Sequence, residues 1–413
     1  MTASADYIRA HQDEWVALLA DLVRIPSAYE DEAAVTGFVA DWLRRHGFSP
    51  VAVPVEPAAM DAHPDAQLPI SRMAGRNNLV VRLPGSGGGR SLIMEAHLDI
   101  QPAGDPALWS HLPFAAAIDS ATGAMYGRGT MDNKAGVAIL LGLLKTIKAT
   151  DLRLSGDLIF QFVIEDETTG NGTLACVEAG FKADGVVLVD GTRPDKACVA
   201  HAGNMEFSLA VEGKSASVSV SHMGVNAAEA LCRILLDMRQ NIHRLNEGRQ
   251  GAWREYPSPY QFVVHGLASD APRFCVPDTA QARCFVTFPP PHSVADIKSL
   301  MEAVASEAAA GLGCRSLVFD WGRFALEPVE GAWQPLIDCL QRALAACHMP
   351  PLTPSPSTGL SDMRHFVSRG MPCVLYGPGR GYNPHRPDEH FMLEDLPRMM
   401  AVYLALAEEW CGT

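Results

Sequence analysis

The sequence predicts an α/β protein of two domains, and three observations support this expectation. The chain has 413 residues, which exceeds what one hydrophobic core usually supports, so about two domains are expected. Short apolar runs alternate with helical patterns, as in a sheet covered by helices on both faces. Between residues 204 and 321 the pattern changes to that of an antiparallel α+β unit.

The first region begins with an amphipathic helix that Pro26 ends. The apolar residues that recur at helical spacing are Ile8, Trp15, Leu18, Leu19 and Leu22. Strands are expected in "NNLVVRLPG", "SLIMEAHLDI", "GDLIFQFVIED" and "DGVVLVDG", with a helix from about Lys134. Because these strands are apolar on both faces, they predict a mixed, mostly parallel sheet whose ligands gather at the carboxyl ends of the strands.

The second region reads as an insertion into the first. "NMEFSLAVEGKSASVSVS" alternates like a strand with one exposed face, and a helix, two further strands and another helix follow, ending near "LVFDWG". This order is typical of a ferredoxin-like α+β unit. We therefore expect residues 1–203 and 322–413 to form a catalytic metal-binding domain, and residues 204–321 to form a separate inserted domain.

Composition limits the classes of partner. The chain has 33 basic and 47 acidic residues and a net charge of −14, which argues against nucleic acids and anionic membranes and favours a small-molecule substrate. No apolar run reaches the roughly 18 residues of a membrane helix. The ten cysteines form no C-x-x-C pair and indicate buried thiols of a reducing compartment. Since "MTASADYIRAHQDEW" lacks the features of a signal peptide, we expect a cytoplasmic location.

Acidic and imidazole side chains follow several of the expected strands. His97 ends one strand, and Asp99 lies two residues later on the same face, where it could orient the ring. Asp132 precedes a helix, the acids 165–167 end the next strand, and Asp190 ends another. A surface pair and a helix N-cap would explain single members but not the series. Such ligands suit zinc, cobalt or manganese, and a bridging carboxylate would make a two-metal site.

Six motifs together carry a resemblance to a known family. They are "HLDIQPAGDPALWSHLPF", "YGRGTMDNKAG", "EDETTGNG", "VVLVDG", "TGLSDMRHF" and "GYNPHRPDEH". From about residue 10 onward the chain resembles the metallopeptidase and deacylase family that includes acetylornithine deacetylase, succinyl-diaminopimelate desuccinylase, aminoacylase and glutamate carboxypeptidase. The resemblance implies two divalent metal ions, a lid domain that forms a homodimer, and hydrolysis of an N-acyl amino acid or small peptide.

The resemblance also implies individual ligands. His97 and Asp190 would hold one metal, Glu167 and His385 the other, and Asp132 would bridge them. His385 is preferred to His390 because the family places its ligand His four residues before a Glu. Family members often have a cis peptide after the bridging Asp, here between residues 132 and 133.

Three positions bear on the reaction. The resemblance implies that the three consecutive acids, residues 165–167, face the metal pair. The residue before the ligand Glu is the general base of the family, usually Glu and here Asp166. It would take a proton from water and pass it to the leaving amine. The family's lid His, an oxyanion donor, corresponds to Ser217, although His222 could substitute. Arg364 lies where relatives hold the carboxylate of the substrate, with a structural salt bridge as the alternative.

These departures leave three interpretations open. In the first, the protein is a metal-dependent amidohydrolase with Asp166 as a working base. In the second, the site is redirected to amide formation, acyl transfer or cyclisation. In the third, it is a non-catalytic metal-binding homologue that acts through its dimer surface.

Overall fold

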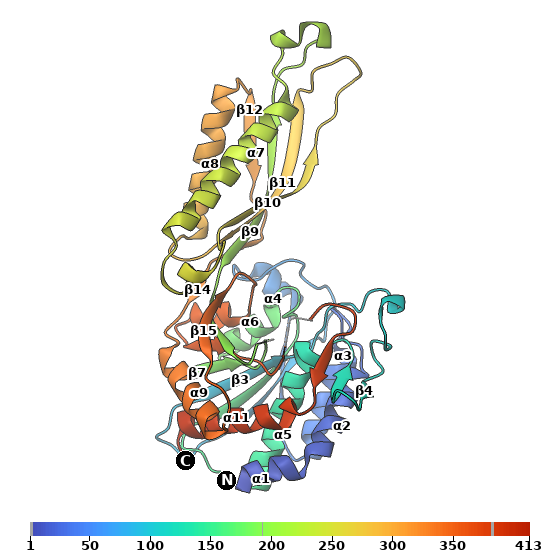
Figure 1. The fold of residues 1–413 in the computed structure, drawn as a ribbon, viewed down its shortest axis with the longest axis vertical. Coiled ribbons are helices and arrows are strands. Elements are labelled where there is room, and N and C mark those ends of the chain that lie inside the picture. Colours follow the sequence, from blue (N-terminus) through green and yellow to red (C-terminus); the bar gives the residue numbers. More distant parts are fainter. Residues whose placement is uncertain (1–2, 192, 381–383) are drawn as a thin grey trace. The chain divides into compact units, whose positions relative to one another are not determined.

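The chain forms two compact units (Figure 1). The computed structural model describes residues 3–191, 193–380 and 384–413. One unit contains the chain up to residue 199 together with 331–354 and 361–413, and the other contains 200–330 and 355–360. Of the helices in the described ranges, none is both long and apolar enough to cross a membrane.

A mixed sheet is the centre of the first unit. Its strands, in spatial order, are β1 (Val51–Pro54), β2 (Asn77–Leu83), β6 (Leu158–Val163), β3 (Leu92–His97), β7 (Gly185–Leu188), β16 (Cys373–Leu375) and β8 (Lys196–His201). Strand β3 is parallel to both β6 and β7, and β7 is parallel to β16. The pairs β1–β2, β2–β6 and β16–β8 are antiparallel.

The register of the central strands positions the site. Every residue of β3 and β6 is buried, which explains why both read as continuous apolar runs. His97 lies opposite Val163, and Glu95 lies opposite Leu188. The carboxyl ends of β3, β6 and β7 therefore lie side by side, and the residues that follow them meet at one edge of the sheet.

Helices cover both faces of this sheet, and Figure 1 shows β3 and β7 between α6 on one side and α5 with α11 on the other. The sequence predicted a single first helix, but the structure divides it at His11 into α1 and α2. The helices of this unit are α1 (Ala3–Ala10), α2 (Gln12–Val23), α3 (Ala33–Arg45), α4 (Pro57–Ala62), α5 (Ala135–Ala149), α6 (Asn171–Glu178), α9 (Gln334–Ala346), α10 (Met363–Val367) and α11 (Asp395–Cys411).

A small antiparallel sheet joins distant parts of the first unit. Strand β5 (Ala124–Tyr126) lies between β4 (Ala117–Asp119) and β17 (His390–Met392). Residue His390 is paired with Tyr126. This pairing holds the segment that contains His385 beside the turn that precedes α5.

The second unit is an antiparallel sheet with two long helices, α7 (Ala227–Arg244) and α8 (Val294–Gly311). Its strands, in spatial order, are β10 (Gln261–Ala268), β11 (Thr279–Phe288), β9 (Gly203–Glu212) and β12 (Ser316–Asp320), with β13 (Ala325–Leu326) beside β9. Alternate β9 residues such as Phe207 and Leu209 are buried against Ile234 of α7 and Ile297 of α8. Strands β14 (Val329–Glu330) and β15 (Thr353–Ser357) lie where the chain passes between units.

Candidate metal centre

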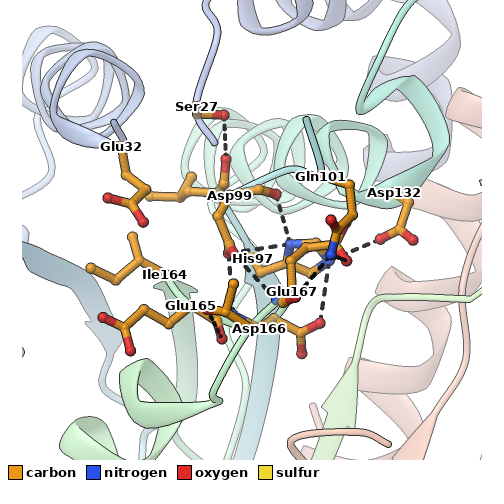
Figure 2. A network of polar contacts seen from close by, with 12 residues as sticks. Ser27, Glu32, His97, Asp99, Gln101, Asp132, Ile164, Glu165, Asp166 and Glu167 are labelled. Carbon is orange, nitrogen blue, oxygen red and sulfur yellow. Dashed lines mark hydrogen bonds and ion pairs between the residues drawn. The ribbon is translucent and has the colours of Figure 1, made fainter. Parts of the chain in front are cut away.

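The ends of the central strands bring the predicted site residues together (Figure 2). His97 is the last residue of β3, Asp166 and Glu167 follow β6, and Asp190 follows β7. Asp132 reaches the same place from the turn before α5. The resulting centre consists of two groups of side chains whose candidate ligand atoms lie within 4.8 Å of one another in each group.

The first group contains His97, Asp166 and Asp190. The Nε2 atom of His97 lies 3.7 Å from Oδ2 of Asp166 and 3.0 Å from Oδ1 of Asp132. The His97 side chain is only 2% exposed, which is unlike a surface histidine. Its ring is therefore fixed in a buried, carboxylate-rich surrounding.

The second group contains Asp132, Glu167 and His385. The Nε2 atom of His385 lies 3.2 Å from Oδ2 of Asp132 and 3.0 Å from Oε2 of Glu167. The alternative His390 instead directs Nδ1 toward the carbonyl of Asp388, and its ring is tilted against that of Tyr126, with ring centroids 5.1 Å apart. Of the two histidines, His385 is the one in the group.

Asp132 connects the two groups. Its Oδ1 faces His97 and its Oδ2 faces His385, so one carboxylate presents an oxygen to each side. Metal–ligand distances of about 2.0 to 2.2 Å place neighbouring ligand atoms about 3 to 4 Å apart, and the measured separations of 3.0 to 3.7 Å fit this range. Imidazole and carboxylate donors in this arrangement suit a pair of divalent cations.

The backbone around Asp132 departs from regular helix. Residues Thr130–Lys134 form a wide turn in which Asp132 has φ −125° and Asn133 has φ −137°. The peptide bond between them is cis, as the sequence resemblance implied. Gly129, with φ +81°, precedes the turn in a conformation that glycine adopts readily.

The electrostatics of the centre favour a bound cation. Burial raises the pKa of Asp190 to about 7, and repulsion from Asp132 adds to the effect. Burial, followed by repulsion from Asp362, raises the pKa of Asp166 well above its usual value. Hydrogen bonds to Asp132 and Glu167 raise the pKa of His385 to about 10. Carboxylates gathered in this way repel one another, and positive charge between them relieves the repulsion.

The contacts of Asp99 are more numerous than the sequence predicted. Its carboxylate lies 3.5 Å from Nδ1 of His97, on the side of the ring where the prediction put it. The backbone oxygen of Asp99 lies closer to the same nitrogen, at 3.0 Å. The carboxylate accepts from the backbone N–H groups of Asp166, at 3.3 Å, and Glu167, at 3.0 Å (Figure 2). Asp99 therefore contacts the ring of His97 through its backbone oxygen, and its carboxylate fixes the backbone of Asp166 and Glu167.

The prediction that all three consecutive acids face a metal pair is wrong for Glu165. Its side chain is 1% exposed and forms an ion pair with Arg76, which also pairs with Glu32 at 2.5 Å. Glu165 has φ +71°, and Figure 2 shows its side chain pointing away from those of Asp166 and Glu167. The partner could not be inferred because Arg76 lies 89 residues earlier in the chain.

Arg364 is held by the backbone. Its Nη2 donates to the carbonyl of Thr169 at 2.6 Å, and its Nη1 donates to that of Ser361 at 3.1 Å. The side chain is 11% exposed and lies 3.5 Å from Asp362. In the second unit, Ser217 is exposed, with its hydroxyl 2.9 Å from that of Ser219, and His222 is also exposed.

The supporting contacts of two residues were not predicted: Gln101 was not singled out, and Glu389 served only to identify His385. Gln101 donates through Nε2 to the backbone oxygen of Glu167 at 2.9 Å and to Oε2 at 3.3 Å. Glu389 is fully buried and accepts from the backbone N–H of Asp132 at 3.2 Å. The spacing of Glu389 from His385 was a usable signal, whereas nothing in the sequence distinguished Gln101.

Comparison with known proteins identifies the family. Residues 93–409 match the sequence profile of Peptidase family M20/M25/M40. The chain belongs to this family. Its membership confirms the resemblance drawn from the six motifs and the predicted α/β fold, and it makes the protein a hydrolase of amide bonds.

Individual M20 relatives are similar over nearly their whole length. A succinyl-diaminopimelate desuccinylase of Gluconacetobacter diazotrophicus is 27% identical, and the alignment covers 96% of each chain. An N-formyl-4-amino-5-aminomethyl-2-methylpyrimidine deformylase of Bacillus subtilis is 24% identical, with 98% of this chain and 96% of the relative covered. A solved M20 peptidase of Bacillus subtilis, which binds a dinuclear metal, superimposes with a TM-score of 0.72 at 17% identity, covering 97% and 98% of the two chains.

Proposed function

We propose that this M20 protein removes an acyl group from an N-acyl amino acid, or cleaves a small peptide, with a pair of divalent cations held by His97, Asp132, Glu167, Asp190 and His385. The observation that carries the proposal is the division of the Asp132 carboxylate, whose two oxygens face different histidines. The desuccinylase and the deformylase both remove a small acyl group from nitrogen, which supports this substrate class. Zinc is the first candidate metal, with cobalt and manganese as alternatives.

In the proposed hydrolysis, different side chains of the centre have different roles. Bound cations would supply Lewis acidity, which activates water and polarises the carbonyl. In this proposal Asp166 accepts a proton from the attacking water and returns it to the nitrogen of the leaving amine. Asp99 fixes the backbone of Asp166 and Glu167, so the base and a ligand keep their spacing. Arg364 holds the same turn through Thr169, and we propose it as the group that meets the carboxylate of the substrate.

The proposed homodimer would form through the second unit. Strand β10 ends the sheet of that unit and exposes Val263, Val264 and Leu267, the last of which is 58% exposed. A terminal strand with apolar side chains is suited to pairing with a second copy. Light scattering on wild type and Leu267→Lys tests this, since a dimer through β10 should dissociate in the variant. A cytoplasmic location remains part of the proposal.

Asp166 and Ser217 stand where the family usually has Glu and His, and this difference leaves two alternative functions open. An Asp base is about 1 Å shorter in reach than Glu, and a misplacement of this size can lower a rate about 10²-fold. A reaction in which water activation is unwanted, such as amide formation, acyl transfer or cyclisation, would tolerate the change. The third alternative is a metal-binding homologue without catalysis.

One experiment separates these functions. Metals are measured in the purified protein, and N-acyl amino acids and dipeptides are screened with wild type and Asp166→Glu. Hydrolysis by wild type supports the proposal. Hydrolysis by the Glu variant alone favours a redirected reaction, and two bound metals with no activity in either favours the non-catalytic homologue. Absence of metal binding contradicts all three.

A further inference from the structure

Glu389 is a buried link between the segment that contains His385 and the turn that presents Asp132. It lies four residues after His385, and its side chain is fully buried. Its Oε1 accepts from the backbone N–H of Met131 at 3.0 Å and of Asp132 at 3.2 Å. Its backbone oxygen accepts from the N–H of Gly127 at 2.9 Å. One residue therefore holds both the segment before the turn, at Gly127, and the turn itself, at Met131 and Asp132.

Arg128, two residues before the turn, completes this link. Its Nη1 donates to Oε2 of Glu389 at 2.6 Å, and both side chains are at most 2% exposed. Its guanidinium lies 5.3 Å from the ring centroid of Trp109, and its Nη2 lies 3.4 Å from the carbonyl of Pro102. Pro102 is in the loop that follows His97. The pair thus joins the three segments that carry His97, Asp132 and His385.

We infer that the buried Arg128–Glu389 pair is a positioning device that sets the distance between Asp132 and His385, and that it governs the affinity of the Asp132, Glu167 and His385 group for its cation. This inference rests on the proposed two-metal site. Within the described residues, neither Arg128 nor Glu389 forms a hydrogen bond or ion pair with His97, Asp166 or Asp190. The first group is therefore affected only through Asp132, and we expect a smaller loss of affinity there. Partners that orient ligands in this way typically account for about 10- to 100-fold in metal affinity.

The test measures each binding step separately. The full chain is freed of metal with a chelator and titrated with Zn²⁺ in competition with a chromophoric chelator. For the weaker step, we expect the dissociation constant to rise about tenfold in Glu389→Gln, which keeps an acceptor for the backbone N–H groups, and about 100-fold in Glu389→Ala, which does not. Arg128→Lys keeps a positive charge but loses the planar guanidinium group. Its dissociation constant for this step should be close to that of Glu389→Gln.

Asp388 supplies a matched control. Its carboxylate accepts from the backbone N–H of Ser110 at 2.7 Å and from the Ser110 hydroxyl at 2.8 Å, which anchors the same segment. In the part of the chain that the structure describes, its side chain has no hydrogen bond or ion pair with the Asp132 turn. In Asp388→Ala, the Zn²⁺ dissociation constants of both binding steps should stay within about threefold of the wild-type values. An equally large loss in this control, an equal loss at both steps in the Glu389 variants, or unchanged affinity in all of them would overturn the inference. If Glu389→Ala does not fold, Glu389→Gln and Arg128→Lys decide.

The outcomes also distinguish this inference from the proposed function. Wild type that binds two Zn²⁺ ions while the variants bind them equally well contradicts only the positioning role. Wild type that binds no Zn²⁺ contradicts both. Far-UV circular dichroism of the metal-free proteins establishes that each variant is folded before the titration.

Discussion

The buried cluster of Arg76, Glu32 and Glu165 leads to an asymmetric prediction for stability. The three side chains are 7%, 2% and 1% exposed, and one positive charge faces two carboxylates. Glu165→Gln removes one negative charge and leaves the Arg76–Glu32 pair balanced, so only one charged hydrogen bond weakens, at a cost of about 1.5 to 3 kcal/mol. Arg76→Met leaves two buried carboxylates without a cation and should lower the free energy of unfolding by about 3 to 5 kcal/mol.

Urea unfolding followed by fluorescence and circular dichroism measures this difference. The surface variant Arg44→Met is the matched control, because Arg44 is 63% exposed in its pair with Asp41 and should change stability by less than about 1 kcal/mol. Both cluster variants should retain the metal content of wild type. Equal destabilisation by Arg76→Met and Glu165→Gln would refute the charge argument. Loss of a metal in Glu165→Gln with unchanged stability would show that Glu165 faces the cations after all.

Four further outcomes follow from the same structure. Removing metal should lower the free energy of unfolding by about 2.7 kcal/mol if the free metal was at 100 times its dissociation constant, and calorimetry with and without chelator measures this. Asp132→Asn should weaken both Zn²⁺ binding steps by at least about tenfold in the chelator competition, because the bridging carboxylate contributes to each group. Asp166→Asn should lower kcat about 10²- to 10⁴-fold while two metals stay bound, measured with any substrate found in the screen. Gly170→Ala should lower the unfolding midpoint, since φ is +68° and a Cβ would lie 2.2 Å from Nη2 of Arg364.

The sequence was sufficient to predict which site residues follow the ends of buried strands. The runs before His97 and Asp190 are apolar on both faces, and such runs mark buried parallel strands whose ends share one edge. The change of pattern near residue 204 likewise indicated the α+β unit. Local periodicity was sufficient in these cases because each element buries its own apolar residues.

Side-chain direction at the ends of strands was not accessible in the same way. The sequence does not distinguish the three consecutive acids. In the structure, Glu165 has a positive φ and pairs with Arg76, whereas Glu167 lies beside His385. At Asp99, the backbone oxygen lies closest to the ring of His97, and the carboxylate accepts from the backbone N–H groups of Asp166 and Glu167. Both contacts depend on the path of the loop after β3. Contacts of this kind are set by segments far apart in the chain, and no spacing rule encodes them.

The order of the ligands along the chain has a consequence for biosynthesis. His97, Asp166 and Asp190 all precede the second unit, whereas His385 follows it. A nascent polypeptide therefore contains the ligands of one group early, and must wait for almost the entire chain to leave the ribosome before it contains those of the other. Fragments that stop before residue 385 would contain the ligands of the first group but not the complete second group.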